Sequence, residues 1–598
     1  MNATSRADLA SYPELSWPAV ILGAGIGTLL TSAFVYIALK LGFGLAGSSV
    51  AAIAGFAVLR GVLRRRSIVE NNINQTVASG INTASAGVVF TLPALMLMSV
   101  DDPSLAQFPL VPLVVAAVAG SLMGIVLIIP LRKQMVELER LKFPSGVATA
   151  TLLRSPGEGV RQATLLAVGG LVGLLLTVLV NLGALPGDFD LGGLVGLPAW
   201  APLALYVSAA NFGAGLLSGR GGLPFAVGGI LAWWVISPVA ATTSDLALPS
   251  GGSVPTDVLI AGEVYGQMLR PLGIGLLIGG ALAGVVAAFP AVRAALSSLA
   301  AAARAAAATG GTADELSPNF LGGAATVGFL ALLFATYTAA PALGPGRTLL
   351  IAVVGAVWLG LAGVIVAQAT GATDISPLSG LSLIAVTLMF FLTGGDVTAS
   401  ILIGLAVCVA INQCADMMSD LKTGHLVGAR PRDQQLAQVL LCWLGPLVAI
   451  GVLWLLWYAP GDGTPGFGPA SVACLNQTAD CLSAPQASAL ASTLDALRSA
   501  DAPVDKYLAG AGLGAALSVF PIGGVAVLVG LAMYLPFSIT LAYGLGCVVS
   551  MRMEQRLGSR FIGSSLVPFA AGLIVGEALT QLGWSLVTVG APLLGGGA

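Results

Sequence analysis

The ionisable side chains of this chain are few, and one pair lies beside an apolar run long enough to cross a membrane. Asp416 and Asp420 are four residues apart, so on a helix they share one face, and Lys422 and His425 follow within a turn. Two carboxylates that meet a cation at a helix end could form a gate, with Asp420 and Lys422 as its charged residues. The same residues could equally form a solvated network at a membrane surface.

Carboxylates at membrane depth are also candidate proton carriers, because an ionisable group in hydrocarbon is costly unless it is neutralised. Asp374 lies beside Pro377 and Gly380 in a break between two apolar runs, where it could instead cap the helix that opens at Pro377. Glu577 lies inside the last apolar run. We therefore predict Asp374, Asp416 and Glu577 as the proton-coupling residues.

A segment rich in amides, residues 67–76, leads directly into the third apolar run. Its side chains can both donate and accept hydrogen bonds, which suits a zwitterionic ligand or a metal chelate. A polar cap that joins two helices is the alternative. The candidate substrate-binding residues of this region are Glu70, Asn71, Asn72, Gln75, Thr76 and, further along the run, Ser79.

Residues 141–151 are too short and too interrupted to cross a membrane. As a half-helix that begins at a Pro-Ser-Gly sequence, they would direct free N–H groups and the positive end of the helix dipole at an anion such as a carboxylate. A plain turn at the cytoplasmic surface is the alternative. The candidate substrate-binding residues here are Pro144, Ser145 and Thr149, and later interruptions of the chain add Ser376, Ser379 and Tyr534.

Composition indicates which elements must position these residues. The 598 residues are 57% hydrophobic and only 9% charged, whereas soluble proteins carry about 25% charged residues. The chain is therefore predicted to be an all-α polytopic membrane protein. At ~20 apolar residues per crossing, it has room for about 14–16 transmembrane helices. We expect several of these to be broken or re-entrant, and the helices to form two related halves.

The predicted organisation follows the apolar runs. Residues 1–16 form a cytoplasmic tail, residues 17–296 the N-terminal transmembrane half, residues 297–317 an interfacial linker, and residues 318–590 the C-terminal half with an extracytoplasmic loop at 459–506. The long run at 507–551 is cut by two prolines. It is predicted to fold back as a re-entrant hairpin, because two plain crossings would place the arginines that follow it outside.

The loops indicate orientation and compartment. Lys and Arg residues gather in alternate loops, which indicates a cytoplasmic N-terminus in a multi-pass protein of the cell membrane, the inner membrane in a bacterium. Cys474 and Cys481 both lie in the predicted extracytoplasmic loop. We predict a disulfide bond between them, with two free thiols as the alternative. The formal charge of −2 offers no basic field for nucleic acid.

Several chemistries leave no trace in the sequence. No lysine follows the glycines of a nucleotide-binding loop, the single histidine rules out paired-histidine metal sites, and no Gly-x-Ser-x-Gly motif occurs. We therefore expect no cofactor, no protein-bound metal and no enzyme activity. Secondary transport is the default for a polytopic protein with interrupted helices. The alternatives are a channel for small polar solutes and, less expected, an intramembrane enzyme.

These segments, in this order, resemble the oligopeptide transporter family, and most closely its prokaryotic members near the yellow-stripe-like branch. The resemblance runs from about Trp17 to Val587. Its motifs are Glu70-Asn71-Asn72 with Gln75-Thr76, Phe143-Pro144-x-Gly146, Ser376-Pro377-x-Ser379-Gly380, Asp420-Leu421-Lys422-Thr423-Gly424, Pro431-Arg432-x-Gln434-Gln435, Tyr534-Leu535-Pro536 and Gly576-Glu577. Residues 372–375 and 412–415 depart from the family pattern.

The resemblance implies secondary active, proton-coupled import of small peptides, glutathione-like compounds or metal complexes of amino-acid chelators, by alternating access. The expected partners are a small-molecule substrate, protons and the lipid bilayer, with a homodimer as a possible assembly and no nucleic acid. One histidine and scattered cysteines provide no soft-ligand cage for a bare transition metal, so a metal would travel inside its chelator. Peptide and metal chelate both stay open as substrates.

Overall fold

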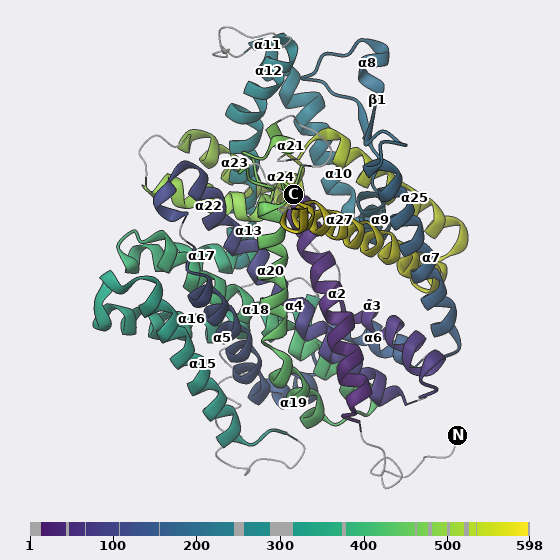
Figure 1. Cartoon of the computed structure of the whole chain (residues 1–598), viewed down its shortest axis with the longest axis vertical. Helices are drawn as coiled ribbons and strands as arrows, with labels where there is room; N and C mark the ends of the chain where they lie inside the picture. Colours follow the sequence, from purple (N-terminus) through teal and green to yellow (C-terminus); the bar gives the residue numbers. More distant parts are fainter. Residues whose placement is uncertain are drawn as a thin grey trace.

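The computed structural model (Figure 1) describes residues 14–42, 47–65, 67–106, 108–154, 156–243, 256–287, 315–373, 378–460, 463–475, 481–498, 503–519, 525–533 and 535–595. This part of the chain is almost entirely helical, as predicted. The exception is a small antiparallel sheet of β1 (Asp188–Asp190) and β2 (Ala204–Tyr206).

The helices before residue 290 are α2 (Trp17–Leu41), α3 (Gly47–Gly55), α4 (Ile68–Asp101), α5 (Leu110–Ile128), α6 (Pro144–Leu153), α7 (Pro156–Asn181), α8 (Leu191–Val195), α9 (Ala209–Ser218), α10 (Leu223–Ile230), α11 (Ser237–Thr243), α12 (Thr256–Val264) and α13 (Arg270–Ala287). Those after residue 314 are α15 (Pro318–Ala339), α16 (Gly344–Thr373), α17 (Leu378–Thr393), α18 (Val397–Val427), α19 (Pro431–Leu441), α20 (Leu444–Tyr458), α21 (Val472–Leu475), α22 (Pro485–Arg498), α23 (Val504–Leu517), α24 (Val525–Met533), α25 (Phe537–Leu557), α26 (Ser559–Phe561) and α27 (Val567–Gly595).

Eleven helices among the described residues are long and apolar enough to cross a membrane, fewer than the about 14–16 expected from chain length. The difference arises where apolar runs form shorter pieces. α3 with its π-helical continuation covers only Gly47–Val62, and the run at 507–551 divides into α23, α24 and α25. The first two of these have 14 and 9 residues, too few to cross a core about 30 Å thick.

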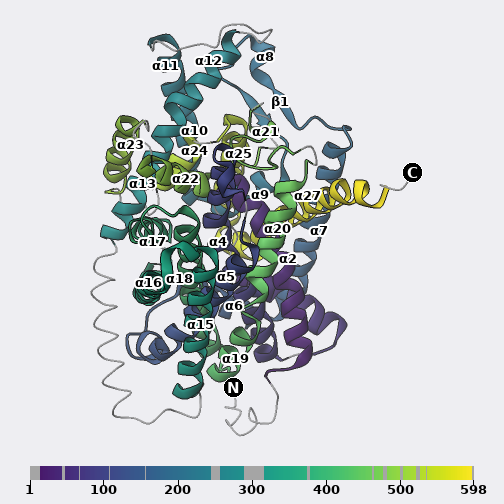
Figure 2. The same ribbon diagram turned by 60° about the vertical axis from the view of Figure 1, so that its left-hand side comes forward.

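α4 and α18 lie at the centre of the bundle, beside α5 (Figure 2), and run antiparallel to each other. α18 begins after Asp396, whose side chain accepts a hydrogen bond from Ala399 N, and ends at Gly428 with φ 83°. The two helices approach closely at Gly87 of α4, where a Cβ would lie 2.3 Å from Val409 N. Glycine at this position therefore lets the two backbones touch.

α2 packs along α4 in the same direction. Gly23 lies against Val77, and Gly27 lies against Ile81. The contacts advance together along both helices, so the end of α2 that carries Lys40 continues well beyond this crossing. The two ends of α2 consequently lie at different depths of the bundle.

The two most polar segments lie in continuous helix. Residues 67–76 include the start of α4, and residues 412–425 lie within α18. Their many polar side chains could have marked an interrupted backbone. Instead, side chains and carbonyl groups of neighbouring helices bind most of these polar groups, so both helices keep their own backbone hydrogen bonds.

Residues 144–153, in contrast, form the separate short helix α6. Pro144 occupies its first turn, where a missing N–H costs nothing, and the preceding Phe143 has φ 44°. The N–H of Phe143 donates to Gly371 O of α16 at 2.9 Å. This hydrogen bond, together with one from Thr423 Oγ1 of α18 to Gly146 O at 2.9 Å, ties the start of α6 to the second half of the chain.

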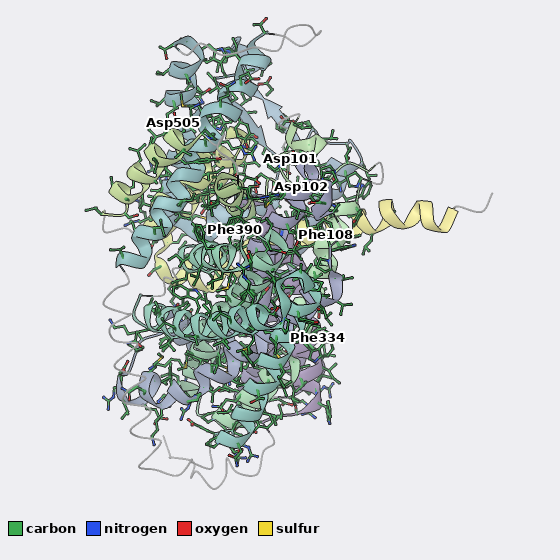
Figure 3. The ribbon with its side chains drawn as sticks, turned by 90° about the vertical axis from the view of Figure 1, so that its left-hand side faces the viewer. Asp101, Asp102, Phe108, Phe334, Phe390 and Asp505 are labelled. Atoms are coloured by element: carbon green, nitrogen blue, oxygen red, sulfur yellow. A yellow bond between two sulfur atoms is a disulfide. The ribbon has the colours of Figure 1, made fainter. Side chains whose placement is uncertain are left out.

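The acidic residues that end α4 and begin α23 lie in the same half of the molecule, away from the start of α2. Figure 3 labels Asp101, Asp102 and Asp505 there. Asp102 accepts hydrogen bonds from Ser104 and from Arg498 of α22, the latter at 2.9 Å. These contacts hold the pKa of Asp102 below its usual value. The ion pair with Arg498 also ties the end of α4 to α22, which follows the cysteines.

Candidate functional site

The polar side chains of α4 and α18 meet along one shared contact. Ser79 Oγ donates to Asp416 Oδ1 at 2.6 Å. One turn further along α18, Gln75 Nε2 donates to Asp420 Oδ1 at 2.5 Å. The structure thereby brings together the amide-rich segment and the carboxylate pair that the sequence singled out separately.

Asp420 is enclosed by neutral hydrogen-bond donors. Its side chain accepts from Gln75 through Oδ1 and from Gln438 of α19 through Oδ2, the second at 2.9 Å. Gln434 donates to the backbone carbonyl of Asp420 and to Thr76 Oγ1, both at 2.9 Å. Asp420 is only 1% exposed, and within the described ranges no lysine, arginine or histidine forms an ion pair with it. Its charge therefore lacks a positive counter-charge.

Asp416 lies in a more open place, surrounded by hydroxyl groups. It is half-buried, and its partner Ser79 also hydrogen bonds with Ser48 at the start of α3, at 2.7 Å. The neighbouring Ser49 pairs with Thr149 of α6 at 3.3 Å. Side chains of the short helices α3 and α6 and of α4 thus converge next to Asp416 of α18.

The asparagines of α4 have different surroundings. Asn71 and Asn74 donate to the carbonyl groups of Ala52 and Ala51 at 3.1 and 3.2 Å, so they hold α4 against α3. Asn72 is fully buried, and neither of its amide atoms has a hydrogen-bond partner among the described residues. Of these three asparagines near the start of α4, two therefore bind the neighbouring helix, and Asn72 is available to a water molecule or a ligand.

Buried amide oxygens that have no hydrogen-bond partner within the described ranges recur around this cluster. They belong to Asn72, Asn74, Asn82, Gln75, Gln413, Gln434 and Gln438. In most of these amides the NH2 group donates a hydrogen bond to a protein acceptor, while the oxygen accepts none from the described residues. An unsatisfied buried acceptor costs about 1–3 kcal/mol. The cluster is therefore suited to water or to a ligand that brings hydrogen-bond donors.

Glu70 and the start of α6 lie at the edge of this arrangement. Glu70 forms an ion pair with Arg65 at 2.5 Å and accepts a hydrogen bond from Ser16 Oγ, so it joins the starts of α2 and α4. Pro144 is exposed and Ser145 is partly buried, whereas Thr149 is buried. Thr149 hydrogen bonds with Ser49, whose neighbour Ser48 contacts Ser79 beside the carboxylate pair.

The two residues predicted as a gate, Asp420 and Lys422, are not paired with each other in this structure. Among the described residues Lys422 makes no ion pair with Asp420 or Asp416, although all three lie on α18. The prediction placed the cation next to Asp420 by sequence distance alone, but residues two apart on a helix point in different directions, and glutamines occupy both oxygens of Asp420. Lys422 instead lies beside Gly146 of α6.

Glu577 lies in a separate buried cluster. Its Oε1 is 3.2 Å from Lys40 Nζ of α2, and it accepts hydrogen bonds from Ser208 Oγ and from the N–H of Ala210. Lys40 lies about 20 Å beyond the level of Gly27 along α2, at 1.5 Å per residue. The structure therefore does not bring Glu577 to the carboxylate pair of α18.

Four predicted residues are not covered by this geometry. Asp374, Ser376 and Tyr534 lie outside the described residues, and nothing is described of the side chain of Ser379 within α17. Their roles stay predictions.

Sequence reasoning missed the partners of the carboxylates and of Glu577. Ser48, Gln438, Lys40 and Ser208 all contact a predicted site residue. A signal was present for two of them: Ser48 interrupts an apolar run, and Lys40 is a charge inside one. Gln438 carried no signal, because its partner Asp420 lies on another helix.

The two loop cysteines are joined. Cys474 and Cys481 form a disulfide bond with a Cα–Cα distance of 4.5 Å. Within the described part of the chain, no group of three or more histidine, cysteine, aspartate or glutamate side chains could hold a metal ion. A metal, if transported, has no protein cage among these residues.

The many membrane-spanning helices and the buried cluster of carboxylates, amides and hydroxyls define a multi-pass membrane protein of the transporter class. A family model for the OPT oligopeptide transporter protein matches residues 14–588, and the chain belongs to this family. The resemblance drawn from the motifs is confirmed, and the chain is a transporter rather than an enzyme.

Individual relatives agree with this assignment. A Haemophilus influenzae protein named for oligopeptide transport is 29% identical over 620 residues, which cover 91% of each chain. A Saccharomyces cerevisiae protein named for the same activity is 37% identical over 105 residues, 17% of this chain and 14% of the yeast protein. An Oryza sativa protein named for metal-nicotianamine transport is 33% identical over 100 residues, 16% of this chain and 14% of its own.

Proposed function

We propose that this protein imports small peptides or metal complexes of peptide-like chelators together with protons, by alternating access around the Asp416–Asp420 pair. The solute contacts Asp416 and the hydroxyl groups beside it, and the carboxylate pair carries the proton. Exchange of the solute between the two sides of the membrane requires both charges to be compensated at each step.

The observation that carries this proposal is that neither the buried Asp420 nor the half-buried Asp416 forms an ion pair with a basic side chain of the described residues. Two carboxylates one helical turn apart repel each other, and the idealised cost of an uncompensated charge in a low-dielectric interior is large. Among the described residues, the side-chain donors to Asp420 are glutamines and those to Asp416 are hydroxyl groups. A proton, or the cationic group of a solute, would supply the missing compensation.

The other candidate carriers fit less well. Glu577 already has Lys40 as a counter-charge, so it needs no proton to be stable in the interior. Asp374 lies outside the described residues and stays a candidate. We therefore place coupling at α18, where the sequence had placed one of its three candidates.

The lining of the site supports a solute with a donor-rich cationic group. Among the described residues, the unpaired buried atoms around the pair are mainly amide oxygens, with one carboxylate oxygen, Asp416 Oδ2, and these atoms accept hydrogen bonds. The ammonium group of a peptide or of an amino-acid chelator donates three. Relatives named for oligopeptide and for metal-nicotianamine transport fit this solute class, and a metal would remain inside its chelator.

We infer the orientation from the position of charges and cysteines. A disulfide bond persists in an oxidising compartment, and the bonded cysteines lie in the loop at 459–506. Asp101, Asp102 and Asp505 lie in the half of the molecule away from the start of α2, and the basic clusters follow alternate helices. This supports a cytoplasmic N-terminus and uptake from the side of the cysteines.

The test is uptake into proteoliposomes with an imposed pH gradient, using a dipeptide and a transition-metal complex of nicotianamine as probes. Asp416→Asn and Asp420→Asn should abolish gradient-driven accumulation. Exchange of internal for external solute at equal pH should continue in at least Asp420→Asn, because the neutral amide mimics the protonated acid. The matched control is Asp396→Asn on the same helix, where asparagine caps equally well and accumulation should persist.

Two outcomes would reject the proposal. Gradient-driven accumulation that is unchanged in both site variants would show that coupling lies elsewhere. Solute flux that only equilibrates in the unaltered protein, with no accumulation, would favour a channel.

A further inference from the structure

The strongest unassigned feature is the buried ion pair of Lys40 and Glu577. Lys40 is 0% exposed and Glu577 is 3% exposed. The two residues are 537 positions apart in the sequence and join α2 to α27. A fully buried lysine within a membrane-spanning helix is expensive and marks a functional position by default.

The two partners are held with very different strength. Glu577 accepts hydrogen bonds from Ser208 Oγ at 2.8 and 2.9 Å and from Ala210 N at 3.0 Å, at the N-terminal end of α9. The positive end of a helix dipole favours a carboxylate there. Glu577 would thus remain well stabilised if Lys40 were to leave it.

Lys40 is bound mainly by two phenol groups. Its Nζ donates to Tyr206 OH at 2.6 Å and to Tyr36 OH at 3.2 Å, and it lies 4.4 Å from the centre of the Tyr206 ring. Its one contact with Glu577 is longer, at 3.2 Å. Among the described residues, Glu577 is therefore the one carboxylate that compensates the charge of Lys40, through a contact that a solute carboxylate could replace.

The end of α2 that carries Lys40 lies beside the segment that follows the disulfide bond. Ala484 N donates to Leu39 O, the residue before Lys40, at 2.8 Å. The adjacent Ser483 lines a small, mainly apolar pocket together with Trp233, Tyr265 and the disulfide. Ser483 Oγ is buried and has no hydrogen-bond partner within the described part of the chain. The lysine therefore lies near a pocket on the side of the cysteine loop.

We propose that Lys40 binds a carboxylate of the solute, and that Glu577 is the counter-ion that occupies Lys40 when no solute is present. An incoming carboxylate replaces Glu577 as the partner of Lys40. Glu577 meanwhile keeps its hydrogen bonds from the N-terminal end of α9. This inference rests on the proposed function only in taking a solute that carries a carboxylate. It supplies what the Asp416–Asp420 pair cannot, since that pair repels anions.

The distance between Lys40 and the Asp416–Asp420 pair implies that a solute binds them one after the other. Lys40 lies about 20 Å along α2 from the level of Ser79, and an extended tripeptide spans only about 10 Å. One small solute cannot bind both sites at once. Lys40 therefore acts at the side of the cysteine loop, and the carboxylate pair of α18 acts at the other.

The test compares a dipeptide such as alanylalanine with its C-terminal amide, by equilibrium binding to purified protein at one pH and without a gradient. The unaltered protein should bind the free acid at least about 10-fold more tightly than the amide, since a hydrogen bond to a charged group is being compared. Lys40→Met should remove this preference. Glu577→Gln should increase it, because the competing internal carboxylate is neutral.

The rise in Glu577→Gln separates a binding role from a structural one, since loss of a purely structural ion pair would only weaken the protein. Either single variant leaves a buried charge unpaired and can fold poorly. The double variant Lys40→Met/Glu577→Gln removes both charges, so it should fold and bind acid and amide equally. Lys133→Met, at an exposed lysine, is the matched control and should keep the preference.

The proposal is overturned if the unaltered protein does not distinguish acid from amide, if the double variant still does, or if Glu577→Gln weakens binding of the acid. Because no proton gradient is used, failure of proton coupling would leave this result untouched, and the reverse also holds.

Discussion

Replacement of Gln438 by leucine should shift the pH dependence of uptake without removing uptake. Gln438 Nε2 donates to Asp420 Oδ2 at 2.9 Å, and among the described residues Gln75 supplies the one other side-chain donor to this carboxylate. A hydrogen bond to a charged group contributes about 1.5–3 kcal/mol, and 1.36 kcal/mol corresponds to one pH unit. Loss of this donor disfavours the ionised acid, so the midpoint of proton-driven uptake should move about 1–2 units to higher pH.

The assay is the initial rate of dipeptide uptake into proteoliposomes as a function of external pH, at constant membrane potential. The matched control is Gln435→Leu on the same helix. Gln435 is also fully buried, but its Oε1 accepts from Leu316 N and it makes no hydrogen bond to Asp420. An unshifted midpoint in Gln438→Leu, or an equal shift in Gln435→Leu, would refute the assignment of the proton to Asp420.

Three further predictions concern packing and the cysteine loop. Gly87→Ala should strongly lower thermal stability and transport, because its Cβ would lie 2.3 Å from the α18 backbone, whereas Gly25→Ala, with open space around it, should change neither. Removal of the disulfide by Cys474→Ser/Cys481→Ser should destabilise the loop by about 2.5 kcal/mol on a chain-entropy model, measured as faster limited proteolysis there; equal rates would contradict this. The ion pair of Asp102 should resist acid, because its pKa is lowered: its contribution is complete above the usual pKa near 4 and is lost only as pH falls through the lowered value. Proteolysis of the loop with an acid protease should therefore accelerate only below about pH 4, and not in Asp102→Asn.

The class of fold follows directly from composition. A chain with 9% charged residues must bury its backbone in helices, since only helices and closed barrels satisfy every peptide group in hydrocarbon. The short helix α6 was also predictable, because its Pro-Ser-Gly start favours a new helix. The number of spans was overestimated because hydrophobicity alone does not reveal that α23 and α24 are too short to cross.

The continuity of α4 and α18 could not be predicted from their own residues. Asn71 and Asn74 look like helix breakers in isolation, but their amides bind carbonyl groups of α3. Whether a polar side chain breaks a helix depends on what the neighbouring helix offers, and this is a property of packing rather than of local sequence.

The partners within the site lie beyond local sequence for the same reason. Asp416 and Asp420 were recognisable by type and spacing, but Lys40 reaches Glu577 across 537 positions. The sequence therefore indicated which residues are costly to bury. The fold decided which of them have a counter-charge and which must obtain one from a proton or a solute.

The most direct test of the central claim is to record internal pH and solute together in proteoliposomes that carry the unaltered protein or the Asp416→Asn/Asp420→Asn variant. The account predicts proton entry in fixed proportion to dipeptide entry in the unaltered protein. In the variant, any remaining solute exchange should occur without proton movement. Proton entry that continues in the variant, or dipeptide accumulation without protons in the unaltered protein, would contradict the account.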